Sequence, residues 1–598
     1  MKSYVNGDSM KKYLTRVLAL LLTAALLLPA AGCHSTSPEN TLKNNYTSFQ
    51  EYTHDVFVNE ISSNTLNLHY TLADPAAYGI TDPKITLGDF SKESMQAAVM
   101  SMENYQAVLH SFSYEDLSPE DQLTYDILDS YFTTELSCPD LYLYGEPLSP
   151  TIGTQAQLPV LFAEYEFRSR QDVDNYLMLL SQLDEYYTSL MDFEKEKAKA
   201  GLFMPSYAAE DVISQCREYI SGEDGNFLLT IFPEKLETVP DLDNDMKQSY
   251  IEQNAAIVEQ DVIPAYQAII GGLETLEKKS KNEYGLCHFK NGRKYYEYIV
   301  RSDTGSARTI PQIQEMLDEQ MKADFQSMAA VIGQHPDILD QLDSYDGIQT
   351  DPNEILSDLQ NKMTPFFPTP PSVSCTVKYV HPSLEKHLSP AFYLTPAIDD
   401  MSSNVIYINQ GSKPDQLDLY TTLAHEGYPG HLYQTVYTNS TSPDCVRSLL
   451  NFPGYVEGWA TYVEMISYGF ADIDRALAKL LQSNQSVTLN LYAHLDIGIH
   501  YDGWTPDDAA AYLNDYGISN PDVVSEIYHA IVEAPGNYLK YYVGCLEFMD
   551  LRKQAQEYLG DQFKLKDFHE FLLKCGPAPF DIVEKYMILW LESVKKPS

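Results

Sequence analysis

The sequence has little positive charge. Lys and Arg number 40 against 85 Asp and Glu, which gives the 598 residues a formal net charge of −45. Nucleic acids need a basic binding surface, so this balance argues against DNA or RNA as a partner. It also argues against a polybasic hold on anionic lipid, and it favours a protein that is soluble outside the cell.

Closely spaced cysteines are absent as well. The eight cysteines include no CxxC motif and lie far apart along the chain. A zinc site built from cysteines, a thioredoxin-type redox motif and a disulfide-stapled scaffold are therefore not expected. We interpret the cysteines mostly as small buried residues.

Only one long apolar run is present, and it lies at the N-terminus. The run, residues 17–28, follows a basic segment and is too short to span a bilayer, which is typical of a signal peptide. The next residues, PAAGC, resemble a bacterial lipobox that ends at Cys33. We therefore expect a signal peptide over 1–32, a lipid on Cys33 and a polar tether over 33–48. The protein would then be extracytoplasmic, at the cell surface or in the periplasm, and held to the membrane through its lipid anchor alone. The alternative is an ordinary cleavage site with a coincidental cysteine.

The rest of the chain has mainly helical periodicity. Apolar spacing predicts long helices over 170–199 and 246–278. After a Pro-rich segment, β-branched and aromatic residues predict three short strands over 372–379, 391–395 and 404–409, and helices then continue to the end. With no convincing linker, we expect one large mainly α domain over 49–598. Its small antiparallel sheet would lie next to the helices that carry a candidate metal site in 390–598, whose residues are identified in the next two segments.

The segment HEGYPGH, from His425 to His431, has the clearest chemistry. Zinc binds imidazoles and carboxylates, and a catalytic site leaves one position open for water. Glu426, beside a ligand histidine, is placed to take a proton from that water. The two histidines are six residues apart, instead of the four in HExxH, so on an ideal helix they would diverge by about 120°. Pro429 between two glycines predicts a bulge or break that lets the imidazoles converge.

A second segment, GYVEGWATYVE over 454–464, supplies carboxylates. A helix that runs beside the first would present Glu457 as the third ligand. Glu464 follows two turns later on nearly the same face, where it would orient a ligand histidine from behind. The two segments together predict a Zn²⁺ site formed by His425, His431 and Glu457. The alternative is a solvated helix end without metal.

These residues resemble the family known as domain of unknown function 885. Its pattern HExxPGHxxQ, followed by EGWA, is matched by residues 425–434 and 457–460, and residues 404–409, 496–504 and 535–544 resemble further family segments. The resemblance implies a large helical, zincin-like metallopeptidase fold of the gluzincin kind, with a deep cleft. It also implies short or unfolded peptides as substrates. The chain departs from the family at two positions, where Asn537 replaces the usual Gln and Tyr542 stands where Lys is common.

Two further groups are candidates for steadying the oxyanion that forms when water attacks a peptide carbonyl. Asp496 and His500 are four residues apart, so on one helix face Asp496 could orient His500. Their alternative is an ordinary helix-surface pair. Tyr541 could donate its hydroxyl to the same oxyanion, although any one of the 45 tyrosines is more often a packing residue.

The sequence therefore predicts a zinc metallopeptidase acting outside the cell through water activated by Glu426. Two alternatives stay open: a peptide-binding surface lipoprotein without turnover, and a metal hydrolase of non-peptide amides or esters. Substrate length, exo- or endo-action and oligomeric state are not predicted by the sequence.

Overall fold

The computed structural model describes residues 46–221, 226–342, 348–380, 385 and 389–595. The predicted signal peptide, the lipidation site Cys33 and most of the predicted tether lie outside the described residues. The seven cysteines in the described part are all free thiols. No helix there is both long enough and apolar enough to cross a membrane.

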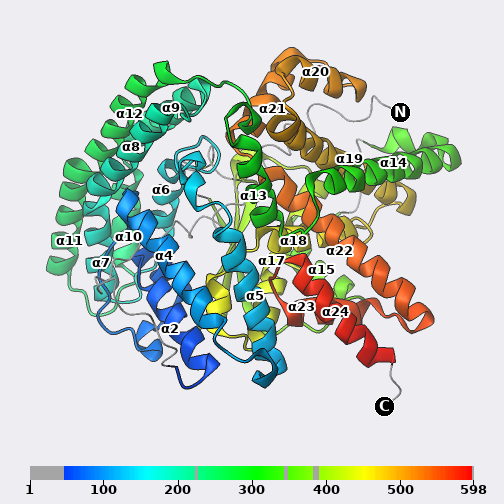
Figure 1. The fold of residues 1–598 in the computed structure, drawn as a ribbon, viewed down its shortest axis with the longest axis horizontal. Coiled ribbons are helices and arrows are strands. Elements are labelled where there is room, and N and C mark those ends of the chain that lie inside the picture. Colours follow the sequence, from blue (N-terminus) through cyan, green and yellow to red (C-terminus); the bar gives the residue numbers. More distant parts are fainter. Residues whose placement is uncertain (1–45, 222–225, 343–347, 381–384, 386–388, 596–598) are drawn as a thin grey trace.

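The N-terminal half is helical, as its periodicity predicted. The long helix expected over 170–199 is divided at Gln182, and the one expected over 246–278 is interrupted by a π-helical turn, Val258–Val262. In Figure 1 the helices α7 to α12 form a curved layer on the left, around their own apolar core. The helices are α2 (Phe49–Ile61), α3 (Thr65–Thr71), α4 (Lys92–Leu109), α5 (Pro119–Glu135), α6 (Thr154–Glu164), α7 (Arg170–Ser181), α8 (Leu183–Ala200), α9 (Ser206–Ile220), α10 (Phe227–Leu236), α11 (Asn244–Ile257) and α12 (Ile263–Leu276).

Three strands follow where the sequence predicted them. They are β1 (Ser374–Tyr379), β2 (Ala391–Leu394) and β3 (Ser403–Ile408), and their order in the sheet is β1-β3-β2. The expected antiparallel sheet is wrong, because the sheet is mixed. Consecutive β2 and β3 pair antiparallel, whereas β1 lies on the other edge of β3 and runs parallel to it.

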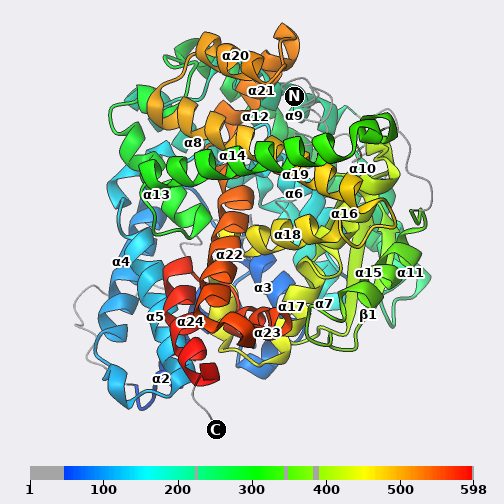
Figure 2. The same cartoon turned by 90° about the vertical axis from the view of Figure 1, so that its right-hand side faces the viewer.

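The remaining helices surround the largest apolar core, which contains the fully buried Trp459. Figure 2 shows α14 and α19 lying side by side near the top, α18 in the middle and α22 running across the start of α18. The helices are α13 (Gly292–Thr304), α14 (Ile310–Gln334), α15 (Pro352–Met363), α16 (Gln416–Glu426), α17 (His431–Ser440), α18 (Pro453–Ser467), α19 (Arg475–Ile497), α20 (Pro506–Asp515), α21 (Pro521–Glu533), α22 (Asn537–Leu559), α23 (Leu565–Cys575) and α24 (Phe580–Lys595).

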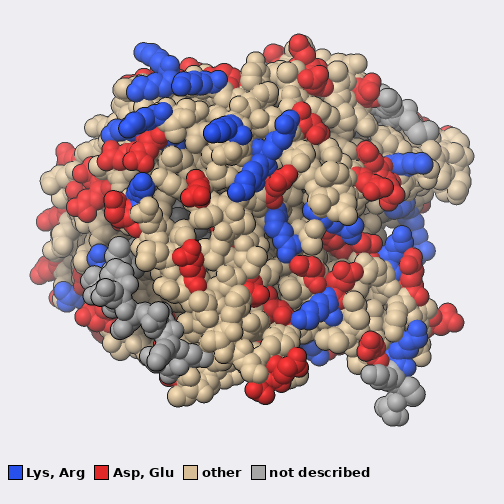
Figure 3. All heavy atoms as spheres, in the orientation of Figure 1, with Lys and Arg blue, Asp and Glu red and all other residues tan. Residues whose placement is uncertain are grey.

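The surface reflects the acidic composition. Figure 3 shows Asp and Glu distributed over the visible face, with Lys and Arg among them in separate groups. A surface of this kind repels acidic ligands at long range.

Candidate metal centre

The predicted break between the two histidines is present. Helix α16 ends at Glu426 and α17 begins at His431, so the four residues between them belong to neither helix. The Tyr428–Pro429 peptide bond in this turn is cis. The imidazole rings of His425 and His431 lie with their centroids 4.8 Å apart. The interruption thus restores the convergence that the six-residue spacing would prevent on a regular helix.

Gly430 makes this turn possible because its backbone lies directly against the end of α16. A Cβ atom at Gly430 would lie 1.8 Å from the carbonyl oxygen of His425, far inside van der Waals contact. The turn is also held by a hydrogen bond, since the indole N–H of Trp459 donates to the Pro429 carbonyl at 2.9 Å. Trp459 lies on α18, so this bond joins the turn to the helix that carries Glu457.

The side chains of His425, His431 and Glu457 meet at one point, although they come from three helices. Each offers one ligand atom, and these atoms all lie within 4.8 Å of one another. Glu457 Oε2 is 3.5 Å from His425 Nε2 and 3.3 Å from His431 Nε2. All three residues are buried.

Two further carboxylates, Glu464 and Glu426, lie next to this group. Glu464 Oε2 lies 3.1 Å from His425 Nδ1, so the ring donates there while its Nε2 faces Glu457. Glu426 points to the sheet, where its Oε2 accepts a hydrogen bond from the backbone N–H of Tyr393 in β2 at 2.9 Å. The small sheet therefore fixes the orientation of Glu426.

The pKa values of three side chains in the site are shifted from their ordinary values. Burial lowers the pKa of His425, but the carboxylates of Glu457 and Glu464 outweigh it and raise the pKa to about 10. Burial opposes ionisation of Glu457, yet His431 and His425 hold its pKa at about 2. Burial raises the pKa of Glu426, partly offset by the two histidines. A raised carboxyl pKa brings Glu426 closer to the range in which a general base works near neutral pH.

The residues fit a divalent metal ion. His425 Nε2 and Glu457 Oε2 are buried and have no hydrogen-bond partner, although buried polar atoms in folded proteins are nearly always paired. Two imidazoles and one carboxylate are a ligand set that zinc takes in catalytic sites. A cation at this point would satisfy both unpartnered atoms.

The structure does not bring Asp496 and His500 together as expected. Both ring nitrogens of His500 contact backbone: Nδ1 accepts from the Leu286 N–H at 3.1 Å, and Nε2 donates to the Ile531 carbonyl at 2.9 Å. Burial lowers the pKa of His500 to about 4, so the ring stays neutral and has no N–H left for a substrate oxygen. A spacing of four residues allows Asp496 and His500 to meet on one helix face. His500 instead contacts Leu286 and Ile531, which are distant from it in the sequence.

Asp496 instead holds the start of α22. Its carboxylate accepts from the backbone N–H of Gly536 at 3.0 and 3.1 Å and from the hydroxyl of Tyr296. Burial raises the pKa of Asp496 to about 7. The first turn of α22 is thereby tied to α19 and α13.

The first turns of α22 carry the remaining candidate, Tyr541, and two residues that the sequence analysis did not select for a role. Tyr541 is buried on α22, one turn before Gly544. Lys540 is also buried, and its ammonium lies 5.4 Å from the centroid of the Tyr541 ring. Asn537 is buried with neither atom of its side-chain amide hydrogen-bonded. The sequence offered one signal for Lys540: it is the only charged residue among the aromatic and apolar residues 538–543.

Known structures share this fold. A "putative lipoprotein" from Colwellia psychrerythraea superposes with a TM-score of 0.80 at 21% sequence identity, over 92% of this chain and 100% of that one. A "putative lipoprotein of unknown function" from Shewanella oneidensis gives a TM-score of 0.62 at 16% identity, over 91% of this chain and 100% of the other. At these identities the likeness establishes the fold alone. No curated protein gives a significant match.

The sequence itself matches a family over most of its length. Residues 75–587 correspond to the family described as bacterial protein of unknown function (DUF885). This range contains the turn between α16 and α17, all three ligand residues, Glu426 and Glu464. The chain therefore belongs to the DUF885 family, and it carries within that family's region a buried His-His-Glu group that could hold a metal.

Proposed function

We propose that this protein is a zinc-dependent metallopeptidase that cleaves short or unfolded peptides outside the cell. The observation that carries the proposal is the buried convergence of His425, His431 and Glu457 with Glu426 beside them. The likeness to gluzincin peptidases and the substrate class come from the sequence resemblance and are part of the proposal. Anchoring through a lipid on Cys33 is also part of it, supported by the lipoprotein descriptions of the two structural relatives.

In this mechanism His425, His431 and Glu457 would hold the zinc ion. Such an ion supplies Lewis acidity, which lets water lose a proton near neutral pH. Glu426 takes that proton and passes it to the leaving amine, and the Tyr393 N–H keeps its carboxylate aimed. Glu464 holds His425 in the tautomer that leaves Nε2, the atom facing Glu457, available to bind the ion. Tyr541 steadies the charge that develops on the carbonyl oxygen, whereas His500 has no part in this step.

Two other functions compete with this one. A peptide-binding lipoprotein without turnover would have no need for Glu426, whose carboxylate is nevertheless held by a backbone hydrogen bond and has a raised pKa. A hydrolase of non-peptide amides or esters would use the same groups, because the same activated water serves each reaction. Substrate assays separate the three.

The test compares zinc-loaded wild type, Glu426→Gln and the matched surface control Glu210→Gln on a mixed peptide library and a panel of non-peptide amides and esters. Glu210 is exposed on α9. We expect wild type and control to cleave peptides, and Glu426→Gln to bind zinc equally but react roughly 10²–10⁴ times more slowly. Full activity in Glu426→Gln would exclude its role as base. Cleavage of the amide or ester panel alone, or of nothing, would favour the corresponding alternative.

A further inference from the structure

Helix α22 touches the metal-binding helix α18 backbone to backbone. A Cβ atom at Gly544 would lie 2.0 Å from the carbonyl oxygen of Gly454 and 2.9 Å from the Cα of Gly458. Only glycine allows this approach, and Gly458 directly follows the metal ligand Glu457. The face of α22 that bears Gly544 therefore lies against the helix that supplies the third ligand.

Asn537 and Lys540 lie on that same face. Asn537 precedes Gly544 by seven residues, nearly two helical turns, and Lys540 precedes it by four. Both side chains are deeply buried, with exposures of 3% and 4%. The Asn537 amide has no hydrogen-bond partner on either atom. The Lys540 ammonium forms no ion pair within the described part of the chain, and the Tyr541 ring is its one specific contact there.

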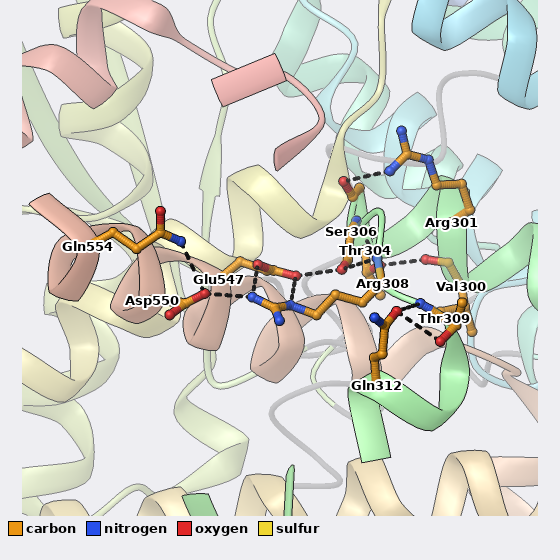
Figure 4. Close-up of polar contacts among 11 residues, drawn as sticks. Val300, Arg301, Thr304, Ser306, Arg308, Thr309, Gln312, Glu547, Asp550 and Gln554 are labelled. Carbon is orange, nitrogen blue, oxygen red and sulfur yellow. Dashed lines mark hydrogen bonds and ion pairs between the residues drawn. The ribbon is translucent and has the colours of Figure 1, made fainter. Parts of the chain in front are cut away.

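These groups are held rigidly. Asp496 fixes the start of α22 through Gly536. Two turns beyond Lys540, the guanidinium of Arg308 donates to both carboxylate oxygens of Glu547, at 2.9 and 3.3 Å, and to Asp550 at 2.6 Å (Figure 4). Since the helix is fixed at both places, Asn537 and Lys540 are positioned before any ligand arrives.

Two acidic groups lie near Lys540 without forming an ion pair with it. Burial lowers the pKa of the Lys540 ammonium, and the negative charges of Glu457 and Asp303 partly offset this effect. A buried cation without an ion pair is unfavourable unless a partner is supplied. An amide that can donate a hydrogen bond, three residues away on the same face, completes a site for an anion.

We infer that Lys540 and Asn537 form a carboxylate-binding subsite next to the metal centre, so that the substrate is a peptide with a carboxylate close to the scissile bond. The inference rests on the proposed function. In a peptide this carboxylate is either the free C-terminus, which makes the enzyme a carboxypeptidase, or an acidic side chain. Because the surface carries a large negative charge, a local cation is what such a substrate needs for binding.

A metal-binding probe tests the subsite without turnover. Succinic monohydroxamate and its primary amide share the hydroxamate and differ only in the pendant carboxylate. We expect zinc-loaded wild type to bind the acid about tenfold or more tightly than the amide in calorimetry, and Lys540→Met to bind both alike with unchanged zinc content.

The matched control Lys553→Met, exposed on the same helix, should keep the preference for the acid over the amide. Asn537→Asp, which is nearly isosteric and adds a negative charge, should weaken the preference even if Lys540→Met fails to fold.

Assays with modified peptides identify which carboxylate of the substrate is bound. Amidation of the C-terminus lowers the cleavage rate if the terminus is bound, whereas Glu→Gln or Asp→Asn in the peptide lowers it if a side chain is bound. If neither hydroxamate binds, the metal-based function is wrong. The subsite can then still be tested by comparing the unfolding temperature of the metal-free protein in succinate with that in succinamide. Equal binding of acid and amide by wild type, or an unchanged preference in Lys540→Met, would overturn the inference.

Discussion

At the scale of single residues, Glu464 contacts His425 and would act on a bound metal through it. Its carboxylate accepts from His425 Nδ1 and so fixes the ring with Nε2 toward Glu457. Removing such a partner lowers metal affinity by roughly 10–100-fold. We therefore expect Glu464→Gln to bind zinc more weakly by that factor in competition with a fluorescent chelator. The exposed control Glu592→Gln on α24 should bind as wild type does, and equal affinity in both variants would show that Glu464 has no such role.

The raised pKa of Asp496 leads us to expect that the free energy of unfolding depends on pH. Its pKa is about 7 in the folded protein, raised mainly by burial, against roughly 4 in an unfolded chain. Between these values the folded state holds a proton that the unfolded state has lost, so the group's contribution to stability falls as pH rises from about 4 to about 7.

Asp496→Asn cannot ionise and removes this contribution. We expect the variant to gain stability relative to wild type across that range, by up to a few kcal/mol, in urea unfolding at several pH values. The exposed control Asp561→Asn should follow wild type. A constant difference between wild type and Asp496→Asn at all pH values would contradict the assignment.

The group that could hold a metal was predictable from the sequence because its residues lie in two short segments with recognisable spacing. His425 and Glu426 end α16, His431 begins α17, and Glu457 lies in α18. Lys540 and Asn537 could not be selected in this way, since their relation to Glu457 depends on the crossing of α22 and α18. The same limit explains His500, whose partners come from residues 286 and 531.

At the scale of elements, the turn between α16 and α17 depends on Gly430. An added Cβ would meet the His425 carbonyl at 1.8 Å, so the backbone that positions both histidines must shift. We expect Gly430→Ala to lose zinc and to be destabilised by about 1–3 kcal/mol or more. Gly271→Ala in α12, where a Cβ meets nothing within 4 Å, should keep zinc and gain about 0.5–1 kcal/mol. Normal zinc content in Gly430→Ala would show that the turn adapts.

The elements themselves were largely predictable, but their arrangement was not. β-branched and aromatic content located all three strands to within about two residues. β1 pairs with the other edge of β3 from β2 and runs parallel to it, an arrangement that the composition of the individual strands does not indicate. Likewise, apolar periodicity predicted helix over 170–199 but not the break at Gln182, because both halves have the same period.

At the scale of the whole molecule, a metal ion bound by His425, His431 and Glu457 would join three helices inside the largest apolar core. A ligand that binds only the folded state raises stability with concentration, by about 2.7 kcal/mol at 100 times its dissociation constant. We expect added zinc to raise the unfolding temperature of the metal-free protein and EDTA to lower that of the zinc-bound protein. His431→Ala should respond to neither, and a variant that responds as wild type does would place the metal elsewhere.

The most direct test of the central claim is the metal content of the purified protein, measured by mass spectrometry for wild type, Glu426→Gln and His431→Ala. His425, His431 and Glu457 as one ligand set predict about one zinc per chain in wild type and in Glu426→Gln, and almost none in His431→Ala. A wild type that binds no zinc, or a His431→Ala variant that retains it, would contradict the metal centre and the peptidase function built on it.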